Sequence, residues 1–100
     1  LPLGGNAIRR ELGPKLMSDV CRALKDSIQY ALDHRESALE YALQFARDLD
    51  TSMADKFVGM YVNERTLDYG QDGRHAIEKL LEMGHQAGII PQEPRVDFAE

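Results

Sequence analysis

Apolar residues recur at helical spacing from position 14 onward. Pro14 suits the first position of a helix, where its missing N–H costs nothing. Four apolar side chains then follow at intervals of four residues: Leu16, Val20, Leu24 and Ile28. Residues so spaced share one face of an α-helix, and the positions between them are largely polar. The pattern therefore predicts an amphipathic helix over residues 14–33.

Two further apolar stripes predict a second helix over residues 36–49 and a shorter third helix over residues 53–61. The second stripe consists of Ala38, Leu39, Ala42, Leu43, Ala46 and Leu49. With His34-Arg35 as a short corner, we expect the first two helices to form an antiparallel hairpin. Ser52, followed by Asp55, is the expected cap of the third helix.

The pattern breaks between residues 60 and 73 and resumes in a last helix over residues 74–87. We expect Asn63 to end the third helix in the left-handed conformation. Asp68 or Asp72 is expected to supply a side-chain oxygen to the start of the last helix, and the neighbouring glycines to serve the turn. Pro91 and Pro94 cannot continue a helix.

These elements predict a mainly α fold with about four amphipathic helices. A short N-terminal extended segment is expected at residues 5–9. We divide the chain into a hinge-like segment at residues 1–13, a helical region at residues 14–90 and a tail at residues 91–100. The first residue is Leu1 and not Met, so we expect the chain to be part of a longer polypeptide.

Composition narrows the possible partners. The 100 residues carry a formal net charge of -5, which argues against nucleic acid, because phosphate binding needs clustered Lys and Arg. No apolar run approaches the ~20 residues that span a bilayer, so no membrane insertion is expected. Cys21 is the single cysteine; an internal disulfide is impossible, and we expect a reducing, cytoplasmic location.

The residues alone offer no assembled active site. His34, His75 and His85 stand in three different settings without a partner motif, which favours surface histidines over a metal site. Cys21 falls in the apolar stripe of the first helix, where a cysteine packs as a small hydrophobe. We therefore predict no catalytic residue, no metal and no cofactor in this chain.

Gly4, Gly5 and Asn6 form the one stretch with a plausible ligand role. Two glycines allow a ligand to approach backbone N–H groups closely, and Asn6 offers both a donor and an acceptor. The stretch lacks the spacing of a phosphate loop, and a plain turn is the competing interpretation.

Three stretches together resemble a known family. Residues 1–13, LPLGGNAIRRELG, resemble the start of the C-terminal segment of the 1,4-dihydroxy-6-naphthoate synthase family, which acts in the futalosine route to menaquinone. Residues 27–34 with 36–41, and residues 61–63 with Leu67-Asp68, match in the same order. The family is related to chorismate dehydratase and to solute-binding-like proteins.

The resemblance implies the helical C-terminal part of a two-lobed, periplasmic-binding-protein-like α/β fold. It implies a small-molecule substrate in a cleft between the lobes, with residues 1–13 near the hinge. Gly4, Gly5 and Asn6 would then contact the substrate. The family's proposed catalytic histidine lies upstream, and none of the three histidines matches its motif.

Two alternatives remain open at this point. The chain can belong to a non-catalytic solute-binding protein of the same fold, or it can be a free-standing helical interaction module. If it is a fragment, its helices leave an apolar face uncovered, and we expect the isolated chain to self-associate, for example as a helical dimer.

Overall fold

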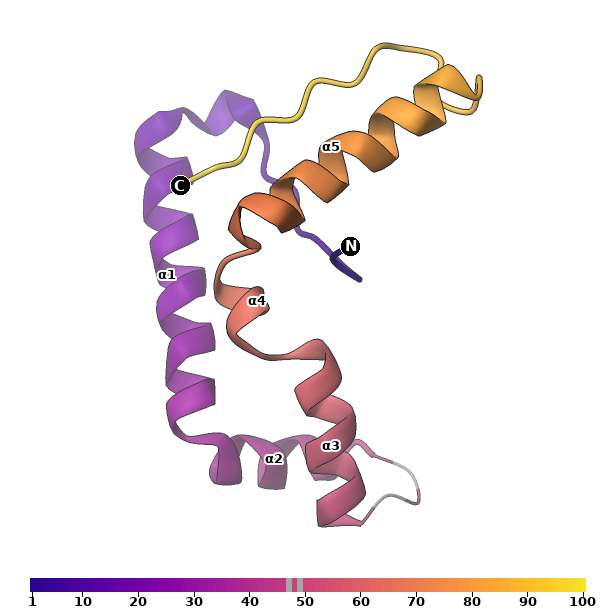
Figure 1. The fold of residues 1–100 in the computed structure, drawn as a ribbon. Coiled ribbons are helices and arrows are strands. Elements are labelled where there is room, and N and C mark those ends of the chain that lie inside the picture. Colours follow the sequence, from indigo (N-terminus) through magenta and orange to yellow (C-terminus); the bar gives the residue numbers. More distant parts are fainter. Residues whose placement is uncertain (47, 49) are drawn as a thin grey trace.

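The computed structural model describes residues 1–46, 48 and 50–100, and its regular elements are helices (Figure 1). In chain order they are η1 (Arg10–Leu12), α1 (Pro14–Asp33), α2 (Arg35–Leu43), α3 (Thr51–Tyr61), α4 (Glu64–Leu67) and α5 (Gly70–Gln86). No strand occurs within the described part of the chain. The mainly α prediction is thus confirmed, and two short elements, the 3-10 helix η1 and the helix α4, are additional to the four predicted helices. None of the described helices is both long and apolar enough to cross a membrane.

Helix α1 has the predicted bounds. Pro14 occupies its first turn, and Gly13 precedes it with a φ of 81°, a left-handed angle that glycine adopts without a steric cost. This angle lets the chain turn from η1 into α1. The amide of His34 bonds to the carbonyl of Tyr30 and closes the last turn of α1.

Helix α2 is shorter than predicted: the prediction of a helix over residues 36–49 is wrong beyond Leu43. From Gln44 to Ala46 the amides bond three residues back, not four, which tightens the turn and ends the helix. Asp48 then has a φ of 59°, which no α-helix accommodates. Leu49, the last member of the predicted stripe, lies outside the described residues.

The expected hairpin is also wrong. In Figure 1, α2 runs across the C-terminal end of α1 and does not return alongside it. Helix α3 is capped by Asp50, whose carboxylate accepts a hydrogen bond from the amide of Met53 at 2.8 Å. Ser52, the predicted cap, lies inside the first turn, because the helix already begins at Thr51.

The connector after α3 contains a helix that the sequence did not predict. Asn63 has a φ of -155° and not the left-handed angle expected of it. Its side-chain oxygen accepts a hydrogen bond from the backbone N–H of Arg65, and its backbone N–H donates to the side-chain hydroxyl of Thr66. Asn63 therefore begins α4 instead of ending α3.

Helix α5 begins four residues earlier than predicted. Gly70 has a φ of 68° and turns the chain from α4 into α5, which confirms its predicted role in a turn. Asp68 accepts from the amide of Gly70 at 2.9 Å, as expected of one of the two aspartates. Gly73 is instead helical, so its expected place in the turn is wrong.

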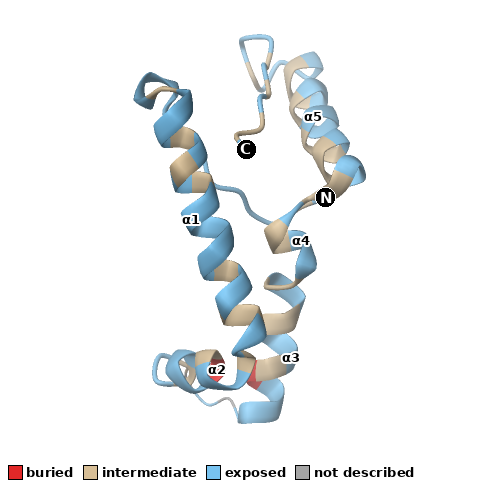
Figure 2. Ribbon diagram, turned by 90° about the vertical axis from the view of Figure 1, so that its left-hand side faces the viewer, coloured by how far each residue is buried: buried red, intermediate tan, exposed pale blue. Residues whose placement is uncertain are grey.

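Few side chains are buried. Leu39 and Ala54 are 7% and 4% exposed and are the buried hydrophobic residues of the described chain. Both lie where α2 meets α3 (Figure 2). Arg35 of α2 reinforces this contact, because its guanidinium donates to the carboxylate of Asp55 at 2.6 Å and to the backbone carbonyl of Asp55 at 3.0 Å.

The molecule is more open than its length requires. Its accessible surface is 8281 Å², whereas a folded chain of 100 residues exposes about 5,700 Å². Its radius of gyration is 16.6 Å, against about 13 Å for a domain of this length. Roughly 2,500 Å² of surface that a self-contained domain would cover is therefore exposed.

Candidate functional site

The predicted ligand segment, Gly4 to Asn6, lies on the surface. All three residues are exposed, and a Cβ placed on Gly4 would meet nothing within 4 Å. The segment is fixed by one side chain from far along the sequence: the hydroxyl of Tyr69 donates to the carbonyl of Gly4 at 2.8 Å. The backbone at Gly4–Asn6 is thus open to a ligand and anchored by a residue from the junction of α4 and α5.

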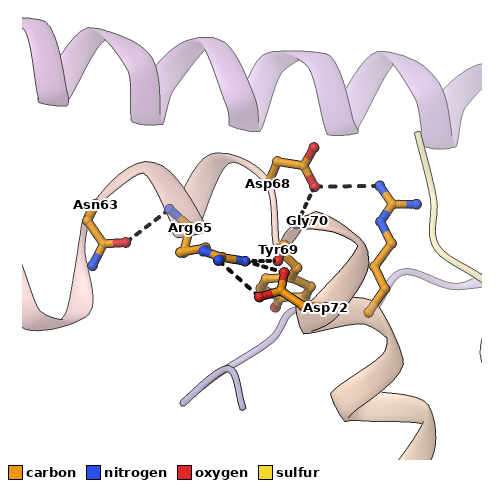
Figure 3. A network of polar contacts seen from close by, with 7 residues as sticks. Asn63, Arg65, Asp68, Tyr69, Gly70 and Asp72 are labelled. Carbon is orange, nitrogen blue, oxygen red and sulfur yellow. Dashed lines mark hydrogen bonds and ion pairs between the residues drawn. The ribbon is translucent and has the colours of Figure 1, made fainter.

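The junction between α4 and α5 sets the position of Tyr69 (Figure 3). The guanidinium of Arg65 forms two hydrogen bonds to the carboxylate of Asp72, at 2.6 and 3.0 Å, and a third to the backbone carbonyl of Tyr69 at 2.7 Å. Such a forked pair is geometrically specific. It ties the first turn of α5 to α4 and leaves the ring of Tyr69 directed toward the N-terminal segment.

Charge pairing shifts the pKa values of this junction. The hydrogen bond from Arg65 lowers the pKa of Asp72 below its ordinary value, and the same bond raises the pKa of Arg65. On the tail, a hydrogen bond from Arg10 lowers the pKa of Asp97. Both carboxylates are thereby kept ionised, which suits structural ion pairs and not general acids.

An open hollow of about 610 Å³ lies beside the junction. Its lining consists of Asp68, Gly70, Gln71, Arg74, His75, Glu78, Phe98 and Glu100. Arg74 forms ion pairs with Glu100 at 2.7 Å and with Asp68 at 3.8 Å, and its guanidinium stacks over the ring of Phe98 at 5.0 Å. These contacts hold the tail against the start of α5.

The other sequence candidates are not brought together. His34 stacks on Tyr30 at the end of α1, His75 is exposed on α5, and His85 bonds to the carbonyl of Ile90. Cys21 is half-buried in α1. Within the described residues, no three His, Cys, Asp or Glu side chains are grouped so as to hold a metal.

Sequence reasoning missed Tyr69 and Arg65. The sequence pattern assigns Tyr69 no role, because nothing local indicates a contact with Gly4, 65 residues away. A weak signal exists in Arg65 and Asp72, whose opposite charges lie seven residues apart across a glycine turn. That spacing alone does not show that the two side chains meet.

A family model and two curated proteins that resemble this chain point to the same biosynthetic family. A family model described as menaquinone biosynthesis matches residues 1–86. The chain is 36% identical to the 1,4-dihydroxy-6-naphtoate synthase of Streptomyces coelicolor over 91 residues, which is 91% of this chain and 32% of that protein. It is 36% identical to the enzyme of the same name from Thermus thermophilus over 98 residues, 98% of this chain and 36% of that protein.

The chain therefore spans about a third of the length of the curated relatives it matches. No solved structure matches it significantly. Tyr69, Arg65 and the Gly4–Asn6 segment all lie within the part that the family model covers.

Proposed function

The chain belongs to the menaquinone biosynthesis family, and we propose that it forms the last third of an enzyme that makes 1,4-dihydroxy-6-naphthoate from cyclic dehypoxanthine futalosine. The observation that carries the proposal is the match of nearly the whole chain to about a third of two synthases. The reaction is inferred from the names of those relatives.

In this proposal the helical region at residues 14–90 packs against the preceding part of the polypeptide, in the two-lobed fold that the family resemblance implies. The open shape supports it, because roughly 2,500 Å² more surface is exposed than a domain of this length leaves uncovered. The exposed surface includes one edge of the apolar stripe of α1, formed by Leu16, Val20 and Leu24. These residues are suited to an internal interface of a larger enzyme.

We assign residues 1–13 to the hinge side of the substrate cleft, with Gly4, Gly5 and Asn6 in contact with the substrate. Their exposed backbone can offer amide donors to an oxygen-rich ligand, and the side chain of Asn6 can add a donor and an acceptor. The groups that perform the chemistry are placed in the preceding part of the polypeptide, since the three histidines of this chain stand apart.

The experiment is an assay of the full-length parent protein with cyclic dehypoxanthine futalosine. Formation of dihydroxynaphthoate, identified by mass, is the expected result. A well-folded parent that binds the compound and leaves it unchanged would favour a solute-binding protein of the same family and would refute the enzymatic proposal.

A further inference from the structure

Tyr69 joins three segments that are remote from one another in the sequence. Its hydroxyl donates to the carbonyl of Gly4 at 2.8 Å, and its ring meets the ring of Phe98 edge to face, with centroids 6.5 Å apart. Its Cβ lies 2.9 Å from the position that a Cβ on Gly73 would take. The N-terminal segment, the start of α5 and the tail thus converge on one side chain.

The surroundings leave Tyr69 little freedom. Arg65 fixes its backbone carbonyl while also holding Asp72, and Gly73 lacks the side chain that would push the tyrosine away. Gly5 is also close to the tyrosine, because a Cβ placed on it would lie 3.1 Å from the hydroxyl of Tyr69. The hydroxyl therefore has a defined place between two glycines of the candidate ligand segment.

We infer that Tyr69 is a positioning residue, whose hydroxyl holds the backbone of Gly4 so that Gly5 and Asn6 present their polar groups to the substrate. This inference rests on the proposed function, since it assigns a task to the same ligand segment. In this inference Tyr69 acts through the segment and not through a contact of its own with the substrate.

The physical consequence concerns binding. Without the hydroxyl, the segment occupies its binding conformation for a smaller fraction of the time, and the apparent dissociation constant rises by the inverse of that fraction. The net strength of one exposed neutral hydrogen bond corresponds to about a 2- to 10-fold change in an equilibrium. Once the substrate is bound, the segment is ordered again, so the chemical step is unaffected.

The test uses the full-length parent with the substitution Tyr69→Phe, which removes the hydroxyl and keeps the ring against Phe98. We expect KM to rise about 2- to 10-fold, with kcat unchanged and the melting temperature lowered by at most a few degrees. Tyr41→Phe is the matched control. It removes the same hydroxyl group away from the segment, because Tyr41 lies on α2 and is 66% exposed. It should leave KM unchanged.

A second variant, Gly5→Ala, probes the same hydroxyl from the other side. The added methyl would press on the hydroxyl of Tyr69 and should raise KM in the natural background. In the Tyr69→Phe background that crowding is relieved, so the KM of the double variant should be lower than the product of the two separate effects predicts. Strictly multiplicative effects would overturn the inference.

The outcomes separate the two proposals. If the natural parent forms naphthoate and Tyr69→Phe leaves KM unchanged, or lowers kcat alone, the inference fails and the proposed function stands. If the natural parent forms no naphthoate, the proposed function fails. The carbonyl ¹³C resonance of Gly4 then decides the inference: a shift in Tyr69→Phe but not in Tyr41→Phe supports it, and an unmoved resonance overturns it.

Discussion

The open edge of α1 gives a quantitative prediction for the isolated chain. Leu16, Val20 and Leu24 recur every four residues and remain 47%, 43% and 45% exposed, so nearly half of their apolar burial is still available. When the remainder of the polypeptide is absent, a second copy of the chain is the available cover. The exposed excess of roughly 2,500 Å² far exceeds the ~800 Å² that each partner contributes to a standard interface.

Substitution of Val20 by lysine tests this association. Full burial of a valine side chain is worth about 1.5 kcal/mol, and Val20 is 43% exposed. The unrealised part is therefore about 0.6 kcal/mol in each copy and about 1.3 kcal/mol in a symmetric dimer. Because 1.4 kcal/mol is a tenfold change in an equilibrium constant, loss of the valine alone weakens dimerisation about tenfold. The buried ammonium adds to that loss.

Sedimentation equilibrium over a concentration series measures the effect. Ser18→Lys is the control, because Ser18 is exposed on the opposite face of α1 and gains the same charge. We expect the Ser18 variant to dimerise as the natural chain does, and the dissociation constant of the Val20 variant to be at least about tenfold higher. A natural chain that stays monomeric at high concentration and binds no dye specific for apolar surface would refute the reasoning.

Three further predictions concern stability. The hydrogen bond from Arg65 lowers the pKa of Asp72. The ion pair therefore contributes its full stabilisation above the unfolded pKa near 3.8, and this stabilisation is lost as the pH falls through the lower folded pKa of Asp72. An NMR titration in which Asp72 titrates at 3.8 or above would contradict this. Arg35→Ala should lower the free energy of unfolding, measured with denaturant, by about 1 kcal/mol, because solvent screens this part-exposed, charge-assisted pair. Arg9→Ala should leave it almost unchanged, because the side chain of Arg9 is 83% exposed. Leu39→Ala should cost about 2–3 kcal/mol, the lower part of the range for buried leucine, and an unchanged unfolding midpoint would show that α2 and α3 do not pack as described.

Local pattern was sufficient for some elements and not for others. Helix α1 has its predicted bounds because a four-residue repeat and Pro14 carry all the information within the segment. The apolar period does not predict the end of α2, because that end depends on the tightened turn from Gln44 to Ala46 and on the left-handed Asp48, and neither changes the period. Asn63 was assigned to the wrong helix, since the same residue type caps either end.

The candidate site shows the same division. The glycines at positions 4 and 5 can be identified as ligand candidates from the sequence, because two adjacent glycines leave the backbone open to a ligand. Their anchor, Tyr69, is defined by a contact across 65 residues, and no periodicity indicates it. The sequence predicts only that the tail is not helical, yet Arg10 of η1 pairs with Asp97, and Arg74 near the start of α5 contacts Phe98 and Glu100. Pairings of this kind appear only when the chain is folded.

We propose that this chain forms part of an enzyme of menaquinone biosynthesis. The most direct measurement is the formation of 1,4-dihydroxy-6-naphthoate by the purified full-length parent from cyclic dehypoxanthine futalosine, followed over time by mass spectrometry. We expect the naphthoate to appear in stoichiometric amount as the substrate disappears. A folded parent that leaves the substrate intact would contradict it.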